Sequence, residues 1–234
     1  MINNNHQPIA ILGGMGPDAS ARLYQMMIEL ARSDFGAVEN HQYPEIIIDS
    51  VPVPEFFSNT AKAEEATFML KDRVRKLNHL QPGCFGLACN TAHTTLADLE
   101  VEAQAPFVSI PYETAKEVKR RGFGKVGLLA APTTIFAGVY QTEFLNQGVE
   151  FVLPDNGQFE TLSEIIGQVI AGEFKAPKAK LLKIADSLKK KKVEAIVLGC
   201  TELPLVFPKN YSLPVLNTLE ILAKALLTRY YKGE

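Results

Sequence analysis

The sequence contains an internal repeat in which each half carries an apolar segment that ends in a cysteine followed by small polar residues. Residues 87–93 read LACNTAH, and residues 198–204 read LGCTELP. Each half also opens with a second apolar segment, at residues 9–14 and 126–131, and the spacing from its start to the cysteine is similar, 89 − 9 = 80 against 200 − 126 = 74. A repeat of this size predicts two similar lobes related by a pseudo-two-fold axis, with both cysteines facing one cleft.

Strand-length apolar segments alternate with helix-length amphipathic segments along the whole chain. The expected strands span residues 8–13, 45–50, 84–89, 107–109, 125–130, 149–152 and 193–198. The expected helices span residues 17–33, 60–79, 92–103, 111–121, 133–147, 158–171, 176–190 and 217–231. Strands separated by helices predict an α/β fold in which each lobe is a mainly parallel sheet flanked by helices.

The lobe boundaries are expected at two proline-containing segments. The chain crosses into the second lobe at Ala105-Pro106 and returns at residues 211–214. The first lobe therefore comprises residues 1–104 and 212–234, and the second comprises residues 105–211.

Composition excludes several function classes. The net charge is −2, and the basic residues are scattered, so neither nucleic acid nor a membrane is an expected partner. The lysines at 189–192 are interpreted as a solvated helix end. The N-terminus does not resemble a signal peptide, which favours a cytoplasmic protein. Three cysteines without metal-type spacing predict free thiols, with no disulfide and no metal.

Ligands of open α/β sheets bind at the carboxyl ends of strands, where backbone N–H groups and helix N-termini lie. Four segments follow expected strands in this way, and they contain Gly14-Met15-Gly16, Cys89-Asn90-Thr91, Thr134 and Cys200-Thr201-Glu202. The glycine segment resembles a dinucleotide fingerprint, but Ala19 occupies its last position and no acidic residue follows at the required distance. A tight turn that brings backbone close to a small ligand, with Pro17 starting a helix, is the favoured interpretation.

The three cysteines receive different interpretations. Cys84 lies inside a strand without polar neighbours, so it is expected to be a core thiol. Cys89 and Cys200 could also be buried hydrophobes, but each precedes polar residues and a helix, where amide dipoles would stabilise a thiolate. His93 and Glu202 follow these cysteines closely and could orient a thiol or a substrate ammonium group. For His93, a purely structural bond to nearby backbone is an equal alternative.

Several motifs together resemble the aspartate/glutamate racemase family, in its branch that works without pyridoxal phosphate. The resemblance covers nearly the whole chain and is carried by residues 13–17 (GGMGP), 89–93 (CNTAH), 138–140 (GVY) and 199–202 (GCTE). It implies a two-base mechanism without cofactor, in which one cysteine thiolate removes the α-proton of an amino acid and the opposite thiol delivers a proton. It also implies that Asn90, Thr91, Thr134 and Thr201 donate hydrogen bonds to the substrate carboxylate, and that the protein is a homodimer.

One departure from the family pattern concerns the substrate. Aspartate racemases of the family carry an arginine after the second strand that binds the side-chain carboxylate, whereas this sequence has Phe56 in the corresponding Pro54-Glu55-Phe56. A second cationic contact of the family corresponds to Lys175. The leading hypothesis, from the family resemblance, is a racemase of aspartate or a related acidic amino acid. The alternatives are a racemase of neutral amino acids or hydantoins, and an amino-acid binding protein without catalysis.

Overall fold

The structure is a computed structural model that describes residues 7–54 and 60–233. The chain divides into two compact units, residues 1–110 with 219–234 and residues 111–218. Both junctions fall a few residues later in the chain than the sequence indicated. None of the helices in the described ranges combines the length and apolar character that are needed to cross a membrane.

The first unit contains a parallel four-stranded sheet in the order β2-β1-β3-β4. Its strands are β1 (Ile9–Gly13), β2 (Ile46–Ser50), β3 (Cys84–Leu87) and β4 (Phe107–Val108). Its helices are α1 (Pro17–Phe35), α2 (Thr60–Asn78), α3 (Leu96–Glu102), α10 (Thr218–Lys232) and the short 3-10 helices η1 (Asn40–Gln42) and η2 (Thr91–Thr95). Every residue of β1 is buried, as expected for a central strand of a parallel sheet covered on both faces.

The second unit repeats this arrangement with the strand order β6-β5-β7-β8, again all parallel. Its strands are β5 (Lys125–Ala130), β6 (Glu150–Val152), β7 (Ala195–Gly199) and β8 (Val215–Asn217). Its helices are α4 (Ile110–Arg120), α5 (Pro132–Phe136), α6 (Gln141–Asn146), α7 (Asn156–Ile170), α8 (Pro177–Lys190) and α9 (Leu203–Val206). Strands β3 and β7 hold the same third place in their sheets, so the sequence repeat corresponds to a structural repeat.

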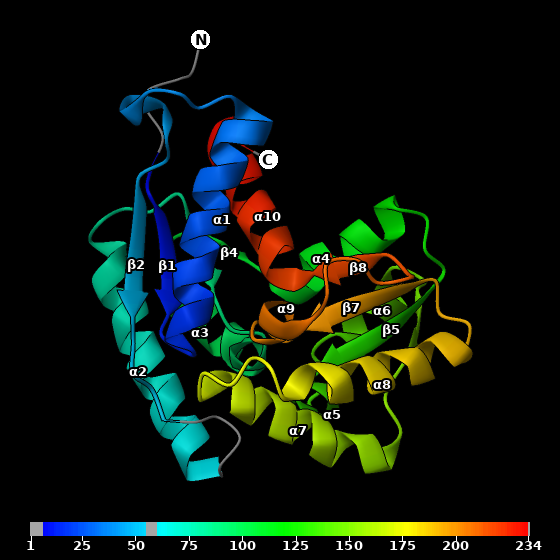
Figure 1. Ribbon diagram of the computed structural model, residues 1–234. Coiled ribbons are helices and arrows are strands. Elements are labelled where there is room, and N and C mark those ends of the chain that lie inside the picture. Colours follow the sequence, from blue (N-terminus) through cyan, green and yellow to red (C-terminus); the bar gives the residue numbers. More distant parts are fainter. Residues whose placement is uncertain (1–6, 55–59, 234) are drawn as a thin grey trace. The chain divides into compact units, whose positions relative to one another are not determined.

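Local sequence signals set the ends of the main helices. Pro17 occupies the first turn of α1, and Gly36 ends it in the left-handed conformation with φ 72°. In α7, Asp155 and Gln158 form a reciprocal capping box. Helix α10 returns to the first unit and lies beside α1 (Figure 1). The rings of Phe35 and Tyr231 stack there, with their centroids 4.7 Å apart.

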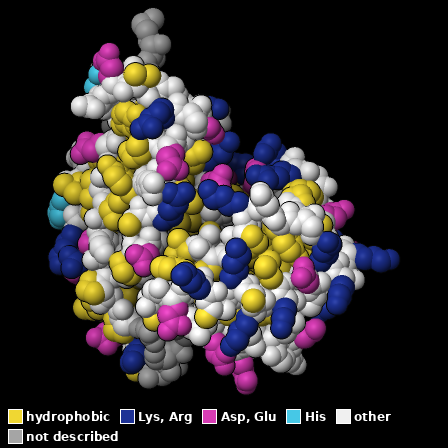
Figure 2. Space-filling view, in the orientation of Figure 1, with side chains coloured by type: hydrophobic (Ala, Val, Ile, Leu, Met, Phe, Trp, Pro, Cys, Tyr) yellow, Lys and Arg dark blue, Asp and Glu magenta, His cyan; other side chains and the backbone are white. Residues whose placement is uncertain are grey.

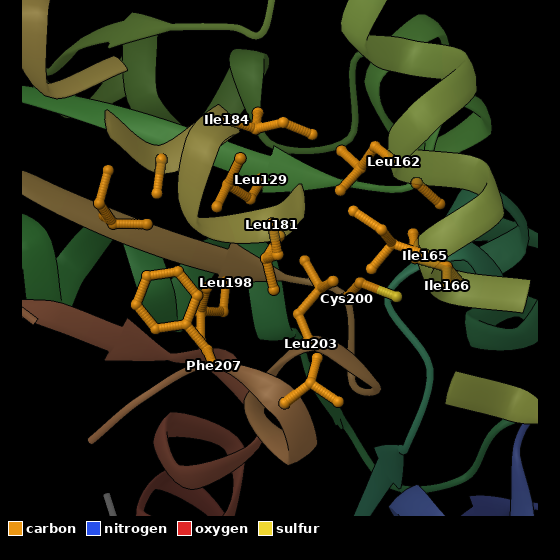
Figure 3. Packing of buried hydrophobic residues seen from close by; sticks show 14 of the residues in the cluster. Leu129, Leu162, Ile165, Ile166, Leu181, Ile184, Leu198, Cys200, Leu203 and Phe207 are labelled. Carbon is orange, nitrogen blue, oxygen red and sulfur yellow. The ribbon is translucent and has the colours of Figure 1, made fainter. Parts of the chain in front are cut away.

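Each unit has its own apolar core. In the second unit, side chains from β5, β7, α7 and α8 interdigitate, including Leu129, Leu198, Ile165 and Leu181 (Figure 3). Helix α8 turns this apolar face inward and leaves Lys178, Lys180 and Lys183 exposed. Figure 2 shows basic side chains on the surface over this helix. Among residues 189–192, Lys189, Lys190 and Lys192 are exposed at the end of α8, as expected for a solvated helix end. Lys189 also bonds Ser212, and Lys191 pairs with Asp155.

The structure confirms the α/β class but corrects several expected elements. Strand β3 ends at Leu87, two residues before Cys89, because the ladder with β1 ends at the bond from the Ala88 N–H to Leu12 and the chain then turns into η2. The expected helix 92–103 is η2 followed by α3, and the expected helix 133–147 is interrupted at Gly138, which has φ 70°. Strand β8, of three residues, and helix α9, of four residues, were not predicted from the sequence.

Candidate active site

The glycine segment that follows β1 is a tight turn packed against the end of β2. Gly14 has φ 88°, and a Cβ atom on it would lie 2.6 Å from the backbone N and O of Val51. Its N–H donates to the hydroxyl of Ser20 at 2.9 Å. Glycine is therefore required here by backbone conformation and by close backbone packing. Ser20 thus binds the Gly14 amide, and its own hydroxyl donates to the carbonyl of Gly16 at 3.3 Å.

Cys89 lies just beyond the carboxyl end of β3, and its neighbours Asn90 and Thr91 form the start of η2. All three side chains are buried, with Cys89 only 7% exposed. The turn is held by backbone bonds, since Ala88 donates its N–H to the carbonyl of Leu12 at 2.9 Å. The thiol is thus placed at the edge of the sheet by two adjacent strands.

His93 is attached to this turn through backbone groups on both sides of its ring. The N–H of Ile110 donates to His93 Nε2 at 3.0 Å, so Nε2 is unprotonated and Nδ1 carries the hydrogen. Nδ1 then donates to the carbonyl of Cys89 at 2.8 Å. Burial lowers the pKa of His93 to about 4, although the backbone bond to Cys89 partly opposes that shift. Of the two interpretations of His93, the structure supports the structural one, because the neutral ring fixes the backbone of Cys89.

In the second unit, the loop after β5 places Thr134 at the carboxyl edge of the sheet. Thr134 belongs to α5, which begins with Pro132, and its side chain is fully buried. The carbonyl of Thr134 accepts the N–H of Val139, which closes the turn at Gly138.

Cys200 follows β7 directly, and Thr201 and Glu202 follow it in a tight turn. The thiol of Cys200 donates to Glu202 Oε2 at 2.9 Å, and the hydroxyl of Thr201 donates to the same oxygen at 2.9 Å. A Cβ on Gly199 would come within about 3.1 Å of Tyr140 and two other side chains, so the strand end is closely packed. Cys200, Thr201 and Glu202 are all buried.

The helical segments that follow the two cysteines are short. Cys89 precedes a 3-10 helix of five residues, and Cys200 precedes an α-helix of four residues. A single turn aligns few peptide dipoles, so the expected stabilisation of a thiolate by a helix N-terminus is weak at both positions. For Cys200, the hydrogen bond from its thiol to Glu202 is therefore more important than a helix dipole.

Lys175 lies in the loop between α7 and α8 and is exposed. Helix α8 packs on the sheet and ends just before β7 begins, so its first residues lie toward the carboxyl edge, the edge where Cys200 lies. Phe56, with Glu55, lies outside the described residues.

Cys84 is separated from the candidate site by the length of β3. It is 2% exposed, and burial raises the pKa of its thiol to about 11, with Arg229 opposing part of that shift. A cavity of about 220 Å³ adjoins it at the amino edge of the first sheet, lined by Gln7, Ile9, Gly83, Cys84, Arg229, Tyr230 and Gly233. This cavity therefore lies at the opposite edge of the sheet from Cys89.

The sequence did not indicate Ser20 or Thr218 as supports of the site. Ser20 binds the Gly14 amide, and the hydroxyl of Thr218 donates to the carbonyl of Leu198 at 2.7 Å, two residues before Cys200. Ser20 was detectable as a hydroxyl in the first turn of a helix. Thr218 gave no local signal, because its partner is 20 residues away. Among the residues the structure describes, no group of three His, Cys, Asp or Glu side chains could hold a metal ion.

These features match a known family. The family model described as Asp/Glu/Hydantoin racemase matches residues 12–226, and the chain belongs to this family. The fold is that of racemases in this family: a glutamate racemase from Francisella tularensis subsp. tularensis SCHU S4, solved with D-glutamate, superposes with a TM-score of 0.71 at 17% identity, covering 99% of this chain and 83% of that one.

Particular relatives cover almost the full length. An aspartate racemase homologue from Pyrococcus horikoshii OT3 is 31% identical with a TM-score of 0.79, over 94% of this chain and 97% of that chain. The aspartate racemase of Picrophilus torridus is 25% identical with a TM-score of 0.82, over 95% and 94%. The broad specificity amino-acid racemase RacX of Bacillus subtilis (strain 168) is 25% identical over 223 residues, 95% of this chain and 97% of RacX.

Proposed function

We propose that this protein is a cofactor-independent racemase that interconverts the L and D forms of aspartate or a related acidic amino acid, with Cys89 and Cys200 as its two bases. The observation that carries this proposal is the matched placement of the two thiols. Each lies at the carboxyl end of the third strand of its sheet, one after β3 and the other after β7. Each is followed by a buried polar residue, Asn90 or Thr201.

The proposed reaction needs one thiolate and one thiol. The thiolate takes the α-proton, the C–H electron pair is delocalised into the substrate carboxylate, and the other thiol donates its proton to the opposite face of the α-carbon. The roles of the two sulfur atoms are exchanged at the end of each turnover, and protons exchanged with solvent restore the starting state. A base whose pKa lies near the working pH is effective in such a step, and an ordinary thiol has a pKa of about 8.5.

Negative charge develops on the substrate carboxylate when the α-proton leaves. Hydrogen-bond donors aimed at this charge each contribute about 3 kcal/mol to transition-state stabilisation in other enzymes. We assign this role to Asn90, Thr91, Thr134 and Thr201, with Met15 and Gly16 as further contacts to the substrate. Thr201 takes this role through its backbone N–H, because its hydroxyl donates to Glu202. All four polar residues are buried and lie next to strand ends.

The substrate class depends on cations near the site. We assign Lys175 to the side-chain carboxylate of an acidic substrate. A second candidate, a racemase of broad or neutral amino-acid specificity, is favoured by two observations. Phe56 stands where the family's carboxylate-binding arginine is expected, and RacX, a relative along nearly its full length, is described as a broad specificity racemase.

Proton exchange in D₂O tests both candidates. Reduced protein without added cofactor is incubated with L-aspartate, L-glutamate and several neutral amino acids. Loss of the α-proton signal in NMR spectra and the appearance of the D enantiomer are then followed for each substrate. We expect both events with aspartate or glutamate. Exchange confined to neutral substrates would replace the first candidate with the second.

Single-cysteine variants test the mechanism. Cys89→Ser and Cys200→Ser should each abolish racemisation while the protein stays folded, and Cys84→Ala is the matched control that should retain it. Full racemisation by either serine variant would contradict the two-base mechanism. Tight ligand binding without deuterium incorporation in the wild-type protein would instead indicate an amino-acid binding protein without catalysis.

A further inference from the structure

The thiol of Cys200 has an acidic partner two residues along the chain. Cys200 Sγ and Thr201 Oγ1 both donate to Glu202 Oε2, each at 2.9 Å. Glu202 itself is only 7% exposed, so water screens this carboxylate poorly. Two donors on a single oxygen hold the carboxylate in place against the thiol.

The surroundings of Cys200 within its own unit are apolar. Its sulfur points toward Ile165 and Ile166 of α7, with Leu203 close by (Figure 3), and all four belong to one hydrophobic cluster. The charged residues of the helices packed there are exposed, namely Glu160 and Glu164 of α7 and Lys178, Lys180, Lys183, Asp186, Lys189 and Lys190 of α8. Strand β7 and helix α9 carry no charged residue. Among the described residues of these elements, Glu202 is therefore the charged group that faces the thiol.

We propose that Glu202 is a positioning residue that keeps Cys200 protonated, so that at neutral pH Cys200 rests as the acid and Cys89 supplies the thiolate. The physical reason is that a thiolate at this position would face a carboxylate at hydrogen-bond distance, whereas the thiol donates a hydrogen bond to it. Thr201 strengthens the effect by fixing the accepting oxygen. The assignment of acid and base rests on the proposed function, but the hydrogen-bonded pair itself does not.

The thiolate content of Cys200 is a more direct measure of this role than a rate. Two enantiomers have equal free energy, so kcat/KM must be the same in both directions for every variant at every pH. A change in the resting protonation of one thiol therefore cannot appear as a difference between kcat/KM for the L enantiomer and kcat/KM for the D enantiomer. The ultraviolet absorbance of the thiolate reports the protonation state without substrate.

The titration uses the full chain with Cys84→Ala and Cys89→Ala, so that Cys200 is the remaining thiol. Thiolate absorbance is recorded against pH for this protein, for the same protein with Glu202→Gln, and for a matched control with Glu160→Gln. Glu160 is an exposed glutamate of the same unit. We expect Glu202→Gln to lower the titration midpoint by about one pH unit, which is about a tenfold rise in thiolate at neutral pH, and Glu160→Gln to leave it unchanged.

An unchanged midpoint in folded Glu202→Gln protein would overturn the proposal. If that variant does not fold, as judged by circular dichroism, Glu202→Asp takes its place. The shorter side chain withdraws the carboxylate from the thiol and should lower the midpoint in the same direction, and no shift in Glu202→Asp would also overturn the proposal. Failure of the D₂O exchange experiment would remove the racemase function but would leave this titration result intact, so the two failures are distinguishable.

Discussion

His93 donates from Nδ1 to the carbonyl oxygen of Cys89 at 2.8 Å, and this bond fixes both the tautomer of the ring and the backbone of the cysteine. The ring can donate here without carrying a charge because its other nitrogen accepts the N–H of Ile110 at 3.0 Å. Protonation of Nε2 would place two hydrogens face to face and break that second bond. The arrangement therefore requires neutral His93.

This requirement predicts a loss of stability on mild acidification. The pKa of His93 is about 4 in the folded protein, below its ordinary value of 6.5 in an unfolded chain. The unfolded state thus binds more protons between these values, and the free energy of unfolding should fall as pH drops from 6.5 toward 4, by up to about 3 kcal/mol for this group. Urea unfolding at a series of pH values measures it.

The matched variant for this measurement is His93→Gln, whose amide can donate to Cys89 and accept from Ile110 without titrating. Between pH 6.5 and pH 5, the unfolding free energy of the wild type should fall relative to that of His93→Gln. That window lies above the titration of Glu102 and Glu117, whose pKa values are lowered to about 2 by bonds to Arg75 and Arg120 respectively. A constant difference across the window would contradict a neutral buried His93.

The turn after β1 makes a second prediction, about glycine. Gly14→Ala should reduce the free energy of unfolding by about 3 kcal/mol, because the new Cβ would meet the backbone of Val51 and the residue would keep a left-handed φ of 88°. Gly122→Ala is the control, since Gly122 has a similar φ of 77° but no atom within 4 Å of the added Cβ. That control should cost about 1 kcal/mol. An equal loss of unfolding free energy in the two variants would mean that the left-handed backbone conformation alone explains the need for glycine at position 14.

The comparison of sequence with structure shows which features are encoded locally. The repeat of strand, helix and strand-end cysteine could be predicted from the sequence. Its signals are apolar segments and the glycine and proline residues that end them, and these act over a few residues. The structural role of His93 was one of two equal alternatives from the sequence, and its bond with the backbone N–H of Ile110 was not predicted because Ile110 is 17 residues away. The bond between Cys200 and Glu202 was only suggested by their proximity, because a two-residue spacing does not determine where the side chains point.

Cys84 is predicted to be chemically inert. Burial raises the pKa of its thiol to about 11, so the reactive thiolate is scarce at neutral pH. Iodoacetamide at pH 8 should leave the Cys84 peptide unmodified in folded protein and modify it fully in urea, as read by mass spectrometry. Cys84→Ala should lower stability by about 1 kcal/mol, because it leaves a small void in β3. Rapid labelling of Cys84 in the folded protein would show that the amino edge of the first sheet opens readily.

Lys175 provides the sharpest test of substrate class. The side chain is exposed in the α7–α8 loop, so Lys175→Ala should leave folding unchanged and act only on ligand binding. If the lysine binds a side-chain carboxylate in both ground and transition states, KM for aspartate or glutamate should rise about tenfold with little change in kcat. KM for a neutral amino acid should stay the same.

The control is Lys178→Ala, which changes an exposed lysine in the first turn of α8 and should alter neither KM nor kcat. A similar rise in KM for acidic and neutral substrates would show that Lys175 does not read the side chain. Specificity would then have to come from another part of the site.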